Sequence, residues 1–435
     1  MTIKLPADVR KIIEILEAHG HSAYAVGGCV RDSLLLREPN DWDITTSASP
    51  EEVKAVFRRT VDTGIEHGTV TVLINRTGYE ATTYRIDGAY HDGRHPESVT
   101  FTPELREDLR RRDFTINAMA YNDRDGLVDL FGGVDDLSKG IIRAVGAPEE
   151  RFSEDALRIM RCIRFSAQLG FEIEPETYRA AEKLAVNLRQ ISRERVREEL
   201  LKTLVSKHPE HVSLFERIGA LSDFYPEFSQ AENERVGLLQ AVAPETALRL
   251  AAFFRKETVF EACGAIETGV KPDFPGDART PLKHKDEAIA DRVMNELRFD
   301  NETRKRVLAL IRFSHEGMEP VKPKLRELLW RYGAEDFEDL MEFYEAANHC
   351  RKDAERALVM EILRDGDCIS LKTLAVKGED LRVAGVAPGR EMGYILGELL
   401  ATVLADAEMN ERTRLLGEVP KIRERYCKEV QKMIK

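Results

Sequence analysis

The sequence predicts an α+β head that contains a small mixed β-sheet, followed by an elongated remainder built only of helices. Two observations predict this class. Up to about residue 146, short β-rich segments alternate with helical ones, and after that point the strand signals stop. Long amphipathic helix patterns then continue through the 435-residue chain. A chain of this length exceeds what one core typically supports, so two or more domains are expected.

Four short segments carry the strand signal in the head. Residues 23–26 (AYAV) and 41–46 (DWDITT) are separate strand candidates. Residues 69–75 and 79–85 are rich in β-formers and flank the turn residues 76–78. This pattern is typical of a β-hairpin.

Helical periodicity dominates after residue 146. The first helices are predicted over residues 153–169, 176–188 and 193–206. Residues 264–281 are rich in Gly and Pro and are predicted to form a loop. The N-terminal residues begin like an amphipathic helix and lack the apolar block of a signal peptide, and no apolar run is long enough to cross a bilayer. A cytoplasmic location is therefore expected.

Composition narrows the classes of function without selecting one. The chain is 43% hydrophobic and 33% charged, as in an ordinary soluble protein. Its six cysteines are scattered without a CxxC pair, which disfavours a zinc site or a disulfide framework. The formal charge of −12 argues mildly against a nonspecific nucleic-acid coat. Local basic patches could still bind RNA, so the charge leaves the partner open.

Asp41 and Asp43 are the first candidate catalytic pair. In a strand, residues i and i+2 point to the same face, so these carboxylates would project together. They would repel each other unless a cation lies between them, and hard oxygen ligands suit Mg²⁺. Upstream, Gly27 and Gly28 can form a tight turn whose N–H groups face an anion, and Arg31 adds a positive charge. The combination indicates two-metal phosphoryl or nucleotidyl transfer; the alternative is a pair of solvated turn residues beside an ordinary glycine turn.

Glu80 is a candidate third carboxylate. It lies in the segment YEATTY, where a carboxylate among β-formers is unexpected unless it is exposed or used. It would complete a metal site or act as general base toward an attacking hydroxyl. An ordinary exposed strand residue is an equal alternative from the pattern alone.

Five segments resemble, in order and spacing, the motifs of one enzyme family. This family is the class II tRNA nucleotidyltransferase and bacterial poly(A) polymerase branch of the nucleotidyltransferases. The segments are GGCVRD with DWDITTS (27–47), RRDFTINAMAY (111–121), DLFGGVDDLSKGIIRAVG (129–146), RFSEDALRIMRCIRF (151–165) and ISRERVREELLKTL (191–204). The resemblance covers residues 23 to about 205. It implies a nucleotidyltransferase head followed by a neck, body and tail, with Mg²⁺ on Asp41 and Asp43, and Gly28 and Arg31 at the nucleotide.

Arg112 and Asp113 belong to the second of these motifs. Arg112 can form a forked contact with phosphate, and Asp113 can accept a hydrogen bond from a ribose hydroxyl. A charged helix start with local ion pairs is the alternative. The resemblance assigns the two residues to the sugar and phosphates of the incoming nucleotide.

The fourth motif carries Asp155, Arg158, Arg161 and Arg164 at every third position. One interpretation is a solvated face with weak ion pairs such as Glu154–Arg158, worth ~0.3–0.5 kcal/mol each. In the other interpretation, the two residues recognise features that cytosine and adenine share. Asp155 accepts a hydrogen bond from the exocyclic amino group, and Arg158 donates one to the ring nitrogen. Guanine and uracil would leave both residues unpaired. The resemblance assigns Asp155 and Arg158 this template role, and places Arg161 and Arg164 toward the triphosphate.

Three further segments bear on the substrate. Residues 85–109 are predicted to form a loop and resemble the flexible loop of family members that add the terminal A. Residues 371–404 resemble the tail of bacterial tRNA nucleotidyltransferases. Residues 420–435 hold six Lys and Arg against two Glu. Such a tail suits binding of the tRNA acceptor and T arms through shape and phosphates.

The residues of the helical half do not show the His-Asp doublet that a metal-dependent HD phosphohydrolase needs, so this class of enzyme is disfavoured. His284 and Asp286 are one residue apart and form no His-Asp doublet. His315 and His349 are predicted to be isolated residues on helix surfaces.

The predicted function is template-independent addition of CCA to tRNA 3′ ends from CTP and ATP, with release of pyrophosphate. The expected partners are tRNA, CTP and ATP, with no membrane and no obligate protein partner. The alternatives are an enzyme that adds only the terminal A, a poly(A) polymerase, and a tRNA-binding protein without turnover. The predicted domains are a catalytic head (1–146), a neck with the nucleotide-selecting helix (147–210), a body with a degenerate, metal-free HD-like region (211–310) and a tRNA-binding tail (311–435).

Overall fold

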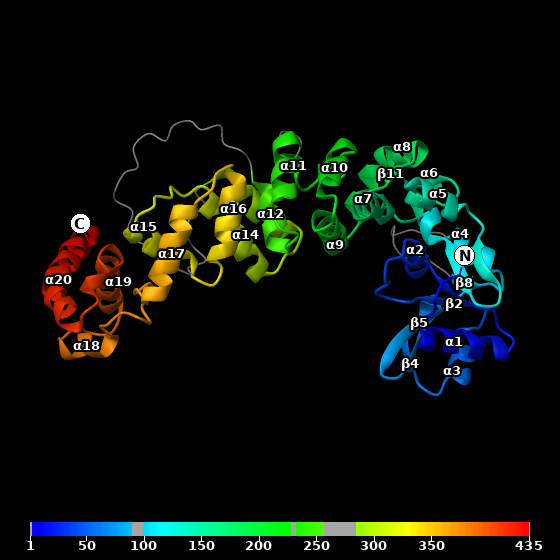
Figure 1. Cartoon of the computed structure of the whole chain (residues 1–435), viewed down its shortest axis with the longest axis horizontal. Coiled ribbons are helices and arrows are strands. Elements are labelled where there is room, and N and C mark those ends of the chain that lie inside the picture. The colour runs from blue at the N-terminus through cyan, green and yellow to red at the C-terminus, as the bar shows by residue number, and fades with distance from the viewer. Residues whose placement is uncertain (1, 89–98, 228–231, 256–283, 435) are drawn as a thin grey trace. The chain divides into compact units, whose positions relative to one another are not determined.

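The computed structural model describes residues 2–88, 99–227, 232–255 and 284–434. The chain forms two compact units (Figure 1). The first comprises Met1–Gln240 with Val293–Arg298, and the second comprises Ala241–Arg292 with Phe299–Lys435. Among the described residues, no helix is both long and apolar enough to cross a membrane. The predicted loop 264–281 lies outside the described residues.

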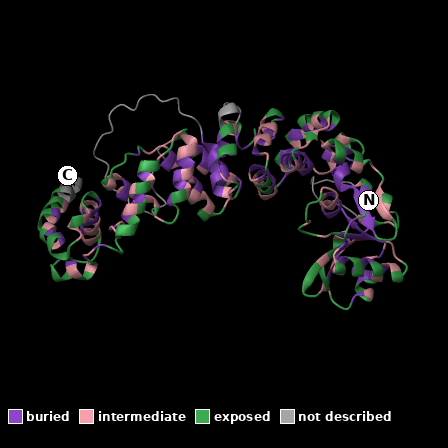
Figure 2. Cartoon of the chain, in the orientation of Figure 1, coloured by how far each residue is buried: buried purple, intermediate pink, exposed green. Residues whose placement is uncertain are grey.

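A seven-stranded mixed sheet is the centre of the head. Its order is β3-β4-β5-β2-β1-β8-β9, and only the β2–β5 pair is parallel among these neighbours. The strands are β1 (Ala23–Val26), β2 (Ile44–Thr46), β3 (Thr60–Gly64), β4 (Thr69–Ile74), β5 (Thr77–Thr83), β8 (Met119–Asn122) and β9 (Gly126–Asp129). Strands β1, β2 and β8 are buried throughout, as Figure 2 shows. The mixed sheet predicted from the sequence is confirmed.

Two strand boundaries differ from the prediction. The β4–β5 hairpin turns at Asn75 and Arg76, both at positive φ, so β5 begins at Thr77. Two such residues make the tight turn that matches the twist of a two-residue hairpin. Strand β2 covers only Ile44–Thr46, so the segment 41–43 precedes it.

Short helices cover the sheet. They are α1 (Ala7–Ala18), α2 (Gly28–Leu34), α3 (Pro50–Val56), α4 (Leu105–Arg110) and α5 (Gly133–Lys139). Helix α1 buries Val9, Ile12, Ile13 and Leu16, the stripe that packs a helix on a sheet. The predicted loop 85–109 contains regular secondary structure in its described part: β6 (Arg85–Asp87) pairs with β7 (Val99–Phe101), and α4 follows, while 89–98 lie outside the described residues.

The helical part of the first unit begins at residue 148. Its helices are α6 (Pro148–Glu154), α7 (Leu157–Leu169), α8 (Pro175–Leu184), α9 (Arg193–Leu204), α10 (Ser213–Arg217) and α11 (Glu232–Ala241). The single helix predicted over 153–169 is wrong, because Asp155 is extended and separates α6 from α7. The helix predicted over 176–188 ends at Leu184 and continues as the 3₁₀ segment η3 (Ala185–Gln190). A two-residue strand pair, β10 (Ile141–Ile142) with β11 (Glu172–Ile173), also extends past residue 146.

The second unit is helical in its described part. Its helices are α12 (Thr246–Phe254), α13 (Lys285–Glu296, ending in the first unit), α14 (Asn301–Ser314), α15 (Lys322–Tyr332), α16 (Phe337–Ala347), α17 (Asp353–Asp365), α18 (Gly378–Val383), α19 (Arg390–Ala405) and α20 (Arg412–Ile434). One apolar core joins Trp330 of α15 to Leu399 and Val403 of α19 and to Leu415 of α20.

His315 is not the isolated surface residue predicted. Its imidazole stacks on His284 with ring centroids 3.9 Å apart, and its Nε2 lies 3.0 Å from Oδ2 of Asp286. Its side chain is 7% exposed. The sequence could not show this contact, because it joins residues about 30 positions apart.

Candidate active site

Asp41 and Asp43 lie at the N-terminal end of β2. Both residues are exposed, and Trp42 between them is half-buried. The carbonyl of Asp43 accepts the N–H of Val26 at 3.0 Å, so the backbone pairing with β1 extends beyond the strand itself. The predicted alternation is therefore present, although the two carboxylates precede the strand.

Glu80 shares the electrostatic field of these two aspartates. It lies on β5, whose parallel pairing with β2 sets Ala81 beside Ile44. Partial burial raises the pKa of Glu80, and the charges of Asp43 and Asp41 raise it further. Partial burial also raises the pKa of Asp43, which Arg112 lowers and Asp41 raises again. Asp43 is solvent-accessible, yet enough protein surrounds it to disfavour its charge. The structure thus brings all three predicted carboxylates together.

A divalent cation would relieve this concentration of negative charge. Within the described ranges, no group of three or more His, Cys, Asp or Glu side chains is placed to hold a metal ion. Mg²⁺ commonly uses one or two carboxylates and completes its shell with water and substrate phosphates. Asp41 and Asp43 supply the hard oxygen donors that such a site needs.

The glycine turn makes room for an arginine. Gly27 has φ +81°, and a Cβ at this position would lie only 2.9 Å from Nη1 of Arg112. Arg112 is held from the other side by the buried carboxylate of Asp108, 3.4 Å from Nη2. Gly28 is the first residue of α2. The arginine therefore packs against the turn and is close enough to Asp43 to lower the pKa of that carboxyl, and a side chain at Gly27 would shift it.

A buried polar chain links Arg31 to Arg161. Arg31 donates from Nη1 to Oδ1 of Asn117 at 2.7 Å, and Asn117 donates to Oδ1 of Asp113 at 3.0 Å. Arg161 donates from Nε to Oδ2 of Asp113 at 2.8 Å. Burial alone would raise the pKa of Asp113, but Arg161 and Asn117 hold it well below its usual range. Arg31 also forks onto Asp32 at 2.9 and 3.0 Å.

Asp155 and Arg158 are held by different partners. Asp155 accepts the N–H of Leu157 at 3.0 Å and Nη2 of Arg195 at 2.9 Å. Buried Arg158 donates to Glu154 at 2.6 Å, to the carbonyl of Arg151 at 3.1 Å and to that of Arg111 at 2.8 Å. The Glu154–Arg158 pair of the alternative interpretation is present, and Asp155 pairs with Arg195.

Arg164 points to a different partner from Arg161. Its Nε lies 2.5 Å from Oε2 of Glu199 on α9, and both side chains are buried. The ring of Phe165 lies beneath three guanidinium groups, at 5.1 Å from Arg31, 5.3 Å from Arg161 and 3.9 Å from Arg164. These contacts fix α7 against both the head and α9.

The sequence reasoning missed the residues that hold the predicted ones. These are Asn117, Asp108, Phe165, Arg195 and Glu199. The last two were visible as charged residues at i and i+4 in the ISRERVREEL segment, a spacing that puts them on one helix face. Nothing in the local sequence indicates their tertiary partners, Asp155 just before α7 and Arg164 on α7.

Three family models match the chain. "Poly A polymerase head domain" matches residues 23–143, and "Probable RNA and SrmB- binding site of polymerase A" matches residues 170–232. A model described as "tRNA nucleotidyltransferase domain 2" matches residues 281–419.

Curated relatives and solved structures agree with these models. The CCA-adding enzyme of Levilactobacillus brevis is 38% identical over 411 residues, which cover 94% of this chain and 96% of that protein. That of Lactiplantibacillus plantarum is 54% identical over 209 residues, which cover 47% of this chain and 51% of that protein. The crystal structure of the Bacillus stearothermophilus CCA-adding enzyme in complex with CTP is 29% identical, with a TM-score of 0.76 over 98% of this chain and 100% of that one. The Thermotoga maritima CCA-adding enzyme complexed with tRNA_CCA, 21% identical, has a TM-score of 0.59 over 96% of each chain and a similar fold.

Proposed function

The chain belongs to the family of CCA-adding enzymes, and on this premise we propose that it adds C, C and A in turn to the 3′ end of tRNA without a nucleic-acid template. CTP and ATP supply the nucleotides. In each cycle the terminal 3′-hydroxyl of the RNA attacks the α-phosphate of the bound nucleotide. The hydroxyl gives up its proton as its oxygen bonds to the α-phosphorus. The bond from the α-phosphorus to the oxygen that bridges to the β-phosphorus breaks, and pyrophosphate leaves.

The main support for this reaction type is the electrostatic coupling of three carboxylates near Arg112. Nucleotidyl transfer requires groups that activate a hydroxyl and others that stabilise charge on the phosphates. The charges of Asp41 and Asp43 act on Glu80, and Arg112 at the glycine turn acts on Asp43. In our proposal the aspartates hold the metal, Glu80 assists at the hydroxyl, and Arg112 binds phosphate with Gly28 and Arg31 nearby.

The family uses a divalent metal ion, which we propose is Mg²⁺. When bound, the ion would lower the pKa of the attacking hydroxyl and offset charge on the leaving pyrophosphate. The donor set of two aspartates contains only hard oxygen atoms, which suits Mg²⁺ and disfavours softer metals.

Asp155 and Arg158 are our candidates for base selection. The contacts described above fix both groups before any nucleotide arrives, as discrimination requires. Arg158 has five N–H donors, and three protein contacts leave capacity for a base. Asp113 and Arg161 are proposed for the ribose and triphosphate. Arg164 would have to leave Glu199 to reach a phosphate, so we assign it to holding α7.

The test uses three tRNA transcripts, ending at the discriminator base, at C and at CC. Each is incubated with the full chain, Mg²⁺ and labelled CTP, ATP or both, and products are resolved at single-nucleotide length. We expect the first transcript to grow by C, C and A, with chelation of the metal abolishing growth. Extension of the CC-ended transcript alone would replace the proposal with an A-adding enzyme. Long A tracts would indicate a poly(A) polymerase, and binding without extension would leave a tRNA-binding protein.

Two further parts of the proposal follow the sequence predictions. We place the head at 1–146, the neck at 147–210, the body at 211–310 and the tRNA-binding tail at 311–435. We also propose that the enzyme acts in the cytoplasm, where its tRNA substrates would be.

A further inference from the structure

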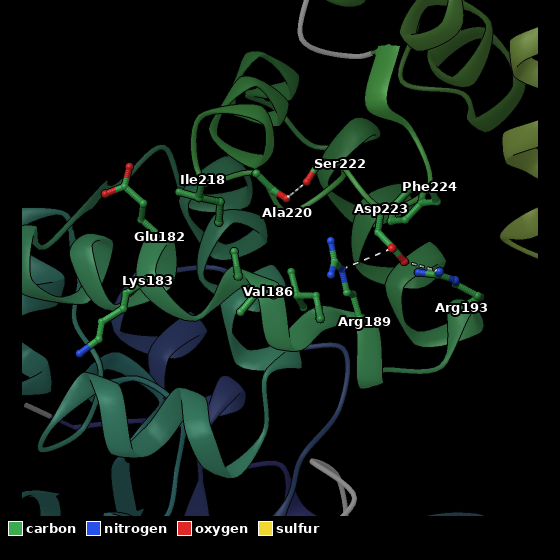
Figure 3. Close-up of a pocket in the computed structure, with 13 residues that line it drawn as sticks. Glu182, Lys183, Val186, Arg189, Arg193, Ile218, Ala220, Ser222, Asp223 and Phe224 are labelled. Carbon is green, nitrogen blue, oxygen red and sulfur yellow. Dashed lines mark hydrogen bonds and ion pairs between the residues drawn. The ribbon is translucent and has the colours of Figure 1, made fainter.

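A recess in the helical part of the first unit takes no part in the proposed chemistry. Its volume is about 260 Å³, and it is lined by η3, the start of α9 and residues 218–224 (Figure 3). One wall is apolar and includes Val186, Ile218 and Ala220. Val186 is 58% exposed, so this wall offers uncovered apolar surface.

The two arginines of the recess are held unequally. Arg193 lies 2.6 Å from Asp223 and 3.1 Å from Glu296, and its guanidinium lies over the ring of Phe224. Arg189 reaches the same Asp223 at 3.4 Å, and its side chain is 64% exposed (Figure 3). Arg193 is therefore fixed as part of the wall, while Arg189 can turn toward a ligand at small cost.

The ion pairs of the lining leave Arg189 as its most available cation. Lys183 pairs with Glu149 at 2.7 Å, and Arg193 is fixed by the two carboxylates named above. Arg189 is held more loosely, at 3.4 Å from Asp223. A phosphodiester carries a single negative charge, which one guanidinium can match. The volume is also below the ~300–1,000 Å³ of sites that enclose a whole small-molecule ligand.

We infer that this recess holds one nucleotide of the RNA substrate, with Arg189 on its phosphate and Val186 against its base or ribose. An arginine fork suits phosphate, and an apolar wall suits the face of a base or sugar. The lining residues fall within 170–232, the range of the matching RNA-binding model. The inference rests on the proposed function, which makes RNA the substrate, and it names a contact remote from the reacting atoms.

The experiment measures binding of a tRNA transcript without CCA to the full chain, by fluorescence anisotropy over a series of salt concentrations. For Arg189→Ala we expect the slope of log affinity against log salt to fall by about one and the affinity to drop roughly fivefold at ~0.1 M salt. Arg189→Lys, which keeps the charge, should keep the slope. Val186→Ser should weaken binding roughly threefold with the slope unchanged, because an apolar contact releases no counterion.

Arg179→Ala is the matched control. Arg179 is an exposed arginine on α8 outside the recess, and its loss changes the net charge by the same amount. We expect its slope and affinity to stay near those of the unmodified protein. If Arg189→Ala behaves like Arg179→Ala, or if it weakens binding of free CTP, the inference is overturned. If the unmodified chain binds tRNA but adds no nucleotide, the proposed function fails. The salt slopes of the variants would still show whether the recess contacts the RNA.

Discussion

Asp43 carries a charge that the fold makes unfavourable. Its own partial burial and the charge of Asp41 both raise its pKa, and Arg112 offsets only part of this effect. Such perturbed carboxylates gather at functional sites more often than in ordinary surface pairs. The unfavourable charge is the physical reason to expect a cation here, and it links the geometry to both activity and stability.

Replacing Asp43 by Asn should abolish most activity while tRNA binding remains. Removing one preorganised charge at a reacting centre typically lowers kcat by at least ~100-fold. The measurement is single-turnover addition of AMP to a CC-ended transcript. Asp62→Asn is the control, because Asp62 is an exposed carboxylate on β3 that pairs with Lys54. Activity within tenfold of the unmodified protein for Asp43→Asn would contradict the assigned role.

Replacing Glu80 by Gln should stabilise the head near neutral pH. The pKa of Glu80 is raised in the folded state, so stability falls as pH rises through that pKa and the group ionises. Glutamine removes this loss. The gain should be absent well below pH 4 and reach at most about 0.5 kcal/mol at pH 7, because water screens the exposed carboxylate. Thermal melts of the full chain at both pH values would measure it, and equal melting at pH 7 would contradict the coupling.

The sequence predicted the chemical types of the site residues better than their partners. The spacing of Asp41 and Asp43 was readable, since it follows from the alternation of extended backbone. The contacts of Asp155 with Arg195 and of Arg164 with Glu199 were not, because each joins residues 35 or more positions apart. Pairing at such separation is decided by helix packing, which no local pattern encodes.

At the scale of elements, the break between α6 and α7 is the feature that periodicity missed. Ala156, Ile159, Met160, Ile163 and Ala167 form an apolar stripe at helical spacing, and all five are buried. The stripe begins only after Asp155, so it does not reveal that Asp155 leaves the helical conformation and separates α6 from α7. The break turns the Asp155 carboxylate toward the first turn of α7 and toward Arg195.

The Arg164–Glu199 ion pair should stabilise the packing of α7 against α9. Glu199→Gln leaves the buried Arg164 charge unmatched and should lower the free energy of unfolding by about 3 kcal/mol. The double replacement Arg164→Met with Glu199→Leu should recover much of this loss, since it removes both charges. Urea unfolding of the unmodified protein, of Glu199→Gln and of the double variant measures the loss and its recovery. Asp135→Asn, which breaks the exposed Lys139–Asp135 pair, should cost less than about 0.5 kcal/mol. Equal costs for the two pairs would contradict this stabilising role.

At the scale of the whole molecule, the residues of the proposed chemistry lie in one of two compact units. Every carboxylate and arginine proposed for catalysis and base selection belongs to the unit of Met1–Gln240 with Val293–Arg298. The second unit has its own apolar core, built by α15, α18, α19 and α20. The sequence correctly predicted a mixed head followed by helices, because the change of period near residue 146 is a local signal.

Cognate nucleotide should therefore stabilise the first unit selectively. A ligand stabilises the folded state that binds it, by about 2.7 kcal/mol at a hundredfold excess over Kd. Hydrogen exchange of the full chain with Mg²⁺ and CTP should slow in peptides from β2, β5 and α7. Peptides from α15, α19 and α20 should exchange as before, since they contribute none of the proposed contacts. GTP is the control, because guanine presents a carbonyl and an N–H where Asp155 and Arg158 require an amino group and a ring nitrogen. If GTP slowed exchange as much as CTP does, base selection at these residues would be contradicted. If exchange in α19 slowed as much as in α7, the confinement of nucleotide binding to the first unit would be contradicted.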